Sequence, residues 1–240
     1  MESRKSLLNL SSVELPDTGL SIRIPTVGEI LEDEFTYYTT VSSLTASPFQ
    51  YMVQLDDMGI DFTRITDFEL FKMLFIMNTK SDMSLLFGSL DVSDFEIYRD
   101  QNSNTFLYSP GNNLIINEKG YEAMADTIRK IHLLEKTKYK PGNESARKYL
   151  LEKERKKQLR SAGKKQEPYL EKLVIALVNT SEFPYDYDSC MNLSIYRFNQ
   201  SFKQIQHKIA FDNTMIGVYA GTVDTSKLSS QDTLSWISST

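Results

Sequence analysis

The run DDMGID at residues 56–61 contains the residue types that bind calcium. An EF-hand calcium loop needs oxygen ligands at alternate positions, Gly at the sixth position and Glu at the twelfth. Counted from Asp56, Gly59 is the fourth residue and Asp67 is the twelfth, so the pattern does not match. The run is therefore predicted to be the capped end of a helix and not a metal site.

Cys190, His132 and His207 are the other candidates for nucleophilic or metal chemistry. A thiol nucleophile needs a base beside it, and no local nucleophile signature surrounds Cys190. Two histidines are too few for a His-based metal site, and one cysteine excludes an internal disulfide. The chain also contains no GxxxxGK[ST] or GxGxxG phosphate-binding motif. These observations predict a protein that is not an enzyme and that binds no cofactor or metal.

The strongest local feature is a basic segment at residues 136–165. It contains twelve Lys or Arg and three acidic residues, which gives a net charge of +9. Because the whole chain carries −5, the remainder carries −14. Most of the segment is predicted to be one helix, from Glu144 to Ala162. The predicted partner-binding cations on this helix are Lys153, Arg155, Lys156, Lys157 and Arg160.

Three interpretations of the basic segment remain open. The segment could bind an acidic protein or the phosphates of a nucleic acid. Alternatively, it is a solvated helix whose positive charges pair with Glu152 and Glu154. Aromatic residues that would stack on single-stranded bases are limited to Tyr139 and Tyr149.

A cluster of Phe and Met residues at 68–83 is the second candidate partner-binding feature, with Phe71 and Phe75 as the predicted contact residues. An adaptable apolar surface suits a protein that holds aggregation-prone clients. The alternative interpretation, which the pattern favours, is that these side chains form the core.

The elements that must position these residues are mostly helices. Apolar residues at helical spacing predict one helix over 27–44, and further helices over 49–55, 68–76 and 85–87. Thr26 is predicted to cap the first of these helices, and Thr66 or Asp67 the third. Before them, alternation at 20–24 predicts a strand, and the first 17 residues are expected to form a loose arm.

Three short apolar runs at 95–98, 105–108 and 114–116 predict a small antiparallel meander, since turn-forming residues separate them. Asn117 is predicted to cap the helix that follows. After the basic helix, the sequence predicts a short helix over 170–178, a loop at 183–188 and a long helix over 191–216. Trp236 is expected to anchor the tail.

The chain is therefore predicted to be α+β and mostly helical. Its predicted parts are an N-terminal α+β domain at 1–135, a basic helical connector at 136–167 and a C-terminal helical hairpin at 168–240. With 240 residues, 40% of them apolar, the chain is long enough to bury a core. The longest apolar run has six residues, at 173–178, so a soluble protein without a membrane span or signal peptide is expected.

Several stretches resemble proteins encoded in the tail region of phages of Gram-positive bacteria. They are IPTVGEIL at 24–31, FTYY at 35–38, LDDMGID at 55–61, ELF at 69–71, LSIYRF at 193–198 and GVYAG at 217–221, followed by Trp236. The resemblance covers residues 20–135 and 168–237 and leaves out the basic segment. Its motifs are packing and capping patterns without a catalytic signature.

The group is usually assigned to tail assembly chaperones, or left as uncharacterised proteins of the phage tail region. The resemblance thus implies a non-enzymatic helper that binds the tail-tube or tape-measure protein, prevents premature polymerisation, acts in the host cytoplasm and is absent from the finished particle. The alternative is a phage structural or nucleic-acid-contacting protein that uses residues 136–165. Homo-oligomerisation is left open by the sequence.

Overall fold

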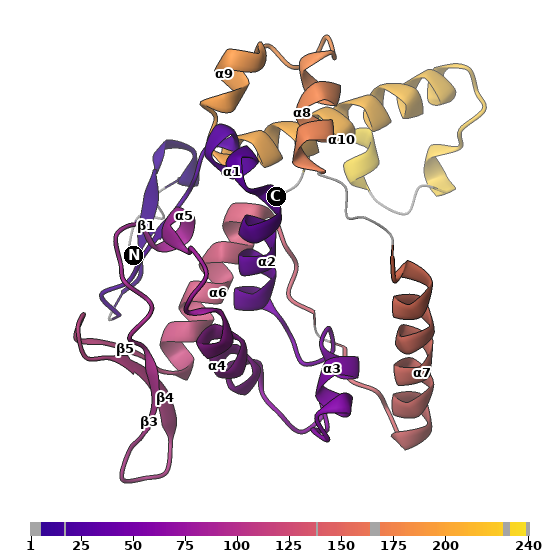
Figure 1. The fold of residues 1–240 in the computed structure, drawn as a ribbon. Helices are drawn as coiled ribbons and strands as arrows, with labels where there is room; N and C mark the ends of the chain where they lie inside the picture. Colours follow the sequence, from indigo (N-terminus) through magenta and orange to yellow (C-terminus); the bar gives the residue numbers. More distant parts are fainter. Residues whose placement is uncertain (1–5, 17, 138, 164–168, 228–230, 239–240) are drawn as a thin grey trace.

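A computed structural model describes residues 6–16, 18–137, 139–163, 169–227 and 231–238 (Figure 1). In these residues the protein is α+β and mostly helical, as predicted, with ten α-helices and two small antiparallel sheets.

The first sheet has two strands. After a 3-10 turn at Leu7–Asn9, β1 (Ser12–Glu14) pairs with β2 (Ser21–Arg23). β2 is the strand that the alternation at 20–24 predicts. β1 lies in the segment expected to be a loose arm, and that expectation is wrong for these residues. Ile22, opposite Val13, is fully buried, so β2 contributes to the core that β1 helps to cover.

Asp33 divides the predicted first helix in two. α1 (Val27–Glu32) ends at Asp33, and α2 (Glu34–Thr45) begins after it. The Asp33 carboxylate accepts a hydrogen bond from the Thr36 N–H at 3.1 Å, so it caps α2. The prediction of one continuous helix over 27–44 is therefore wrong at this residue. The predicted cap at Thr26 is confirmed, because Thr26 and Glu29 form a capping box at the start of α1.

α2, α4 (Asp67–Asn78) and α6 (Glu118–His132) lie against one another at the centre of the molecule (Figure 1). Of the two residues predicted to cap α4, Thr66 is the cap, since it forms a capping box with Glu69. The predicted cap at Asn117 is confirmed, because its side chain accepts from the Gly120 N–H. Where α4 meets α6, the rings of Phe71 and Tyr121 stack with centroids 4.5 Å apart.

Two short helices and the meander surround this centre. α3 (Met52–Asp57) begins three residues later than predicted, and α5 (Ser84–Phe87) ends at Gly88 with a φ of 65°. The meander is confirmed, with β3 (Glu96–Arg99), β4 (Thr105–Ser109) and β5 (Leu114–Ile116) in that order. Leu107 of β4 pairs with Ile116 of β5, and both side chains are buried in the core.

The last four helices are α7 (Glu144–Ser161), α8 (Leu170–Val178), α9 (Tyr187–Met191) and α10 (Ile195–Tyr219). α7 and α8 lie where the sequence predicts helices. Two predictions around α9 are corrected. Asp186 caps α9, so the loop predicted at 183–188 ends before Tyr187, and Ser194 caps α10, so the long helix begins at Ile195 and not at Met191.

The C-terminal helices share one hydrophobic core with the N-terminal part of the chain. The Ile195 N–H donates to the Pro25 carbonyl at 2.8 Å, and the Val27 N–H donates to the Leu193 carbonyl at 2.9 Å. Phe198 and Val174 belong to the same cluster of buried side chains as Ile30 and Phe71. The described parts of 1–135 and 169–238 are therefore packed on each other.

Trp236 does not anchor the tail through its ring. Its side chain is 59% exposed, and its backbone carbonyl accepts a hydrogen bond of 2.6 Å from the Gln204 side chain. The His207 ring is 2.7 Å from the Ser235 carbonyl. The tail is thus attached to α10 by its backbone, and the expected role of the indole ring is corrected.

Candidate functional site

The basic helix α7 lies against α3 through one face. Leu151 is buried on that face, in a small cluster of apolar side chains that is separate from the main core. The other buried members of this cluster are Ala46, Met52, Val53, Leu55, Phe62 and Leu70. Arg147 and Arg155 lie one helical turn on either side of Leu151, so they point toward the same neighbour.

The carboxylates of the DDMGID run bind these two arginines. One nitrogen of the Arg155 guanidinium donates to Asp56 at 2.8 Å and to Asp57 at 2.5 Å. Arg147 pairs with Glu144 at 2.8 Å and lies 3.9 Å from Asp61. These hydrogen bonds raise the pKa of both guanidinium groups. The acidic run is thus the docking site of a helix in the same chain, and the described residues contain no group of three metal-ligating side chains.

The structure separates the five predicted cations of α7 into three groups. Arg155 is engaged with α3. Lys157 lies 3.4 Å from Glu154 on its own helix. Lys153, Lys156 and Arg160 are exposed, and their helical spacing places them with Tyr149 opposite the Leu151 face. We call Tyr149, Lys153, Lys156 and Arg160 the outer stripe of α7.

Phe71 and Phe75 present no surface to a partner. Each side chain is 1% exposed, and Phe75 has a T-shaped contact with Phe95 at 5.5 Å. Lys72, between them, is also buried, and its ammonium lies 4.6 Å above the Phe68 ring. The interpretation of the Phe cluster as core is confirmed, and the prediction that these two phenylalanines contact a client is corrected.

An exposed apolar surface occurs instead at the end of α10. Every residue of α10 is described, and no side chain after Ile205 is buried. We call residues 206–219 together with the tail at 231–238 the C-terminal arm; in Figure 1 the end of α10 extends away from the central helices, and the tail runs back along α10. Its exposed apolar side chains are Ile209, Ile216, Tyr219, Leu234, Trp236 and Ile237.

Sequence reasoning missed this surface. Apolar residues at helical spacing continue from Phe198 to Ile216, so the periodicity predicts one buried face along all of α10. The pattern does not show that other parts of the chain bury this face only as far as Ile205. Among the residues that the structure describes, Ile216 is 66% exposed and Tyr219 is 82% exposed.

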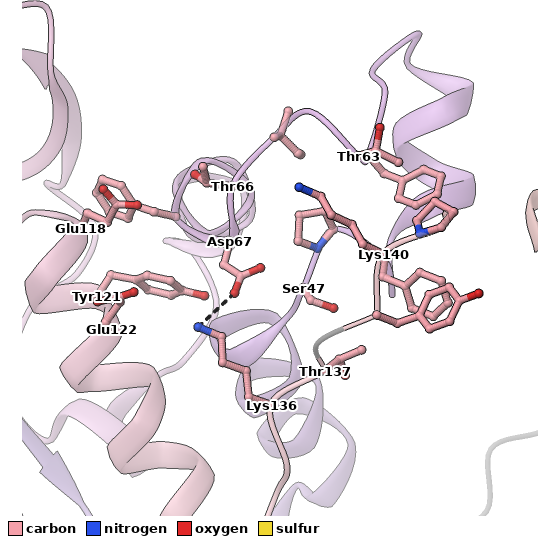
Figure 2. A pocket seen from close by; sticks show the side chains of 17 residues that line it. Ser47, Thr63, Thr66, Asp67, Glu118, Tyr121, Glu122, Lys136, Thr137 and Lys140 are labelled. Atoms are coloured by element: carbon pink, nitrogen blue, oxygen red, sulfur yellow. Dashed lines mark ion pairs between the residues drawn. The ribbon is translucent and has the colours of Figure 1, made fainter. Parts of the chain in front are cut away.

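The basic connector begins at a pocket on the body (Figure 2). This cavity of about 360 Å³ lies between the loops before and after α3, the first turns of α4 and α6, and residues 136–137 and 139–141. The Lys136 ammonium pairs with Asp67 at 3.4 Å. The Tyr121 hydroxyl is directed toward this pair and has no hydrogen-bond partner among the described residues; burial raises its pKa to about 12. The ion pair fastens the connector to the start of α4.

Cys190, His132 and His207 lie in three different environments. Cys190 is fully buried in the core, which raises the pKa of its thiol. His132 is buried, and its Nε2 lies 2.9 Å from the Tyr37 hydroxyl. His207 instead contacts the tail at the Ser235 carbonyl. The described structure therefore does not join these groups into a nucleophile–base pair.

Residues 163–240 match the family model of the YomV second domain, a family associated with phages and prophages. This segment covers about a third of the chain and contains α8, α9, α10 and the C-terminal arm. No curated protein and no solved structure matches the chain. The C-terminal segment is thus similar to a phage-associated domain, in agreement with the coarser part of the resemblance described above.

None of the described helices combines the length and the apolar character needed to cross a membrane.

Proposed function

We propose that this protein is a non-enzymatic tail assembly chaperone of a phage, which binds the tail-tube or tape-measure protein before the tail is built. The observation that carries this proposal is the C-terminal arm. Its apolar side chains are exposed, and it lies in the segment that is similar to a phage-associated domain.

An arm of this kind suits a client that polymerises. Tail subunits must bury apolar surface against one another, so a protein that covers this surface delays their assembly. Tyr219 is 82% exposed and Trp236 is 59% exposed. Large aromatic side chains contribute most to binding at protein interfaces, which makes these two the expected anchors. A chaperone of this type acts in the host cytoplasm and leaves before the particle is complete.

The proposal is tested by size-exclusion chromatography with light scattering, using this protein and the tail-tube protein encoded by the same phage or prophage. A stoichiometric complex and slower tube polymerisation are expected. The variant Ile216→Asp/Tyr219→Asp should lose both effects, because it places two carboxylates on the arm. A matched control is Met77→Asp/Ile175→Asp, which changes two exposed apolar residues outside the arm and should retain both.

The tape-measure protein is assayed in the same way. If neither client forms a complex with the wild-type protein, the chaperone proposal fails. If the arm variant and the control bind equally, the arm is not the client-binding surface.

The outer stripe of α7 favours a second function, contact with nucleic acid. Three cations and a tyrosine lie on the face that α3 does not use. Phosphate contacts release counterions, so binding to a short duplex should weaken steeply with salt and should be lost in Lys153→Glu/Lys156→Glu/Arg160→Glu. Fluorescence anisotropy at several salt concentrations measures this. If the wild-type protein does not bind the duplex even at low salt, the second function is ruled out.

A further inference from the structure

A groove with a volume of about 1050 Å³ lies at the junction of α1 and α2, beside the start of α8. Its carboxylates are Glu32, Asp33, Glu34 and Glu171. Its aromatic side chains are Phe35, Tyr38, Tyr51 and Tyr169. Among its described lining residues there is no Lys, Arg or His. The groove therefore combines concentrated negative charge with apolar walls.

Glu34 fixes one wall of this groove. Its Oε1 accepts the N–H groups of Tyr169 at 2.7 Å and Leu170 at 2.9 Å, which ties the start of α8 to α2. Its Oε2 is buried and has no hydrogen-bond partner among the described residues. Burial and the charge of Glu34 raise the pKa of Tyr38 to about 12. The Glu34 carboxylate therefore adds negative charge at this wall of the groove.

The chemistry of the groove suits Lys and Arg side chains. A carboxylate forms charge-assisted hydrogen bonds with an ammonium or guanidinium group. The same cation is attracted to the face of a Phe or Tyr ring within about 6 Å, and its alkyl stem covers apolar surface. A cationic helix face brings several such side chains together.

The same chain carries a cationic helix face of this kind. In the outer stripe of α7, Lys153 and Arg160 are seven residues apart, which is roughly 10 Å along a helix. Leu151, Arg147 and Arg155 hold the opposite face of α7 on α3. Because α7 packs on α3 through the opposite face, the outer stripe points away from the rest of its own chain.

We propose that the acidic groove binds the outer stripe of α7 from a second copy of this chain. The charge distribution supports this pairing, because residues 136–165 carry +9 and the remainder carries −14. The two surfaces differ, so the contact either closes reciprocally into a dimer or continues from copy to copy. It needs no client and stands independently of the chaperone proposal.

Sedimentation velocity of the purified full chain tests this association. At about 50 mM salt we expect a mass of two chains or more. At about 1 M salt, where the Debye length falls to about 3 Å, we expect the single-chain mass of 27.6 kDa. A single-chain mass at every salt and protein concentration would overturn the proposal.

Two sets of charge reversals locate the contact. Lys153→Glu/Lys156→Glu/Arg160→Glu reverses the stripe. Glu32→Lys/Glu171→Lys reverses two exposed groove residues and leaves the capping residues Asp33 and Glu34 in place. Each set alone should weaken self-association by roughly tenfold or more. The control Lys80→Glu/Lys119→Glu, at two exposed lysines elsewhere, should leave self-association intact.

Mixing the two variants gives the decisive result. The new glutamates on the stripe of one variant can then pair with the two new lysines in the groove of the other, and the unchanged stripe and the unchanged groove also match. Association should therefore reappear in the mixture, which also excludes misfolding as the cause of its loss. Association that survives the groove reversal, or a mixture that stays at the single-chain mass, would contradict the proposal.

Discussion

Arg155 of α7 donates a hydrogen bond of 2.8 Å to Asp56 of α3, across 99 residues of the chain. The acidic run and the basic segment are thus two sides of one contact. Their charges are partly used within the protein, while the outer stripe of α7 stays exposed.

Removing both arginines that hold α7 should release this helix without unfolding the body. In Arg147→Ala/Arg155→Ala, the ion pairs with Asp56, Asp57 and Asp61 are lost, and only the small cluster around Leu151 holds α7 on α3. Hydrogen exchange measured by mass spectrometry should become faster in peptides from 144–161 and stay slow in α4 and α6.

Lys148→Ala/Lys157→Ala is the matched control, because both lysines are exposed on the same helix and lie outside the outer stripe. It should leave exchange in α7 unchanged. If the arginine variant exchanges like the wild-type protein, the ion pairs do not determine the docking of α7.

Replacing Phe71 should affect stability and not client binding. Phe71→Ala removes a ring that is 1% exposed and stacked on Tyr121, so a loss of about 3–5 kcal/mol in the free energy of unfolding is expected. Phe35→Ala, at a side chain that is 64% exposed, should cost far less. Urea unfolding measures both. A small loss at Phe71 would contradict its place in the core.

The buried imidazole of His132 should make stability depend on pH. Burial lowers the pKa of His132 from its ordinary value of 6.5 to about 4. Below pH 6.5 His132 binds a proton in the unfolded chain but stays neutral in the folded protein. The contribution of neutral His132 to the free energy of unfolding is therefore complete above pH 6.5 and decreases as the pH falls toward 4. The loss reaches ~3 kcal/mol at most, since each unit corresponds to about 1.36 kcal/mol.

The variant His132→Gln isolates this effect, because its side chain stays neutral and can still donate to the Tyr37 hydroxyl. Between pH 7 and pH 5 the wild-type protein should lose about 2 kcal/mol more than the variant in urea unfolding. Equal losses would show that another group is responsible.

The cap of α4 should contribute measurably to stability. The Thr66 hydroxyl accepts from the Glu69 N–H at 3.1 Å, and Thr66→Ala removes this bond at a cost of about 1 kcal/mol. Thr127→Ala, inside α6, removes no cap and should have a small effect of either sign. Thermal unfolding of the two variants separates these outcomes, and equal behaviour would contradict the role of the cap.

The Cys190 thiol should be unreactive while the protein is folded. It is fully buried, and burial raises its pKa, so little thiolate forms and reagents cannot reach it. Reaction with a colorimetric disulfide reagent should be slow in buffer and fast in urea. Rapid reaction in buffer would show that the core around α9 opens.

Local signals determined much of this fold, because they act between residues three or four apart. The caps at Thr26, Thr66 and Asn117 are set by a side chain and an N–H group close in sequence. The meander follows from short apolar runs separated by turn residues. For the same reason the sequence alone was enough to predict the helical extent of α7 and the class α+β, mostly helical.

Only the tertiary structure decided which faces are covered. Periodicity predicts an apolar face, but the neighbour that packs on it comes from distant parts of the chain, which is why Phe71 is buried while Ile216 is exposed. The division of α7 into docked arginines and an outer stripe likewise depends on the position of α3. Burial and charge pairing are properties of the whole arrangement, so the sequence predicted the candidate cations and the structure determined which of them face outward.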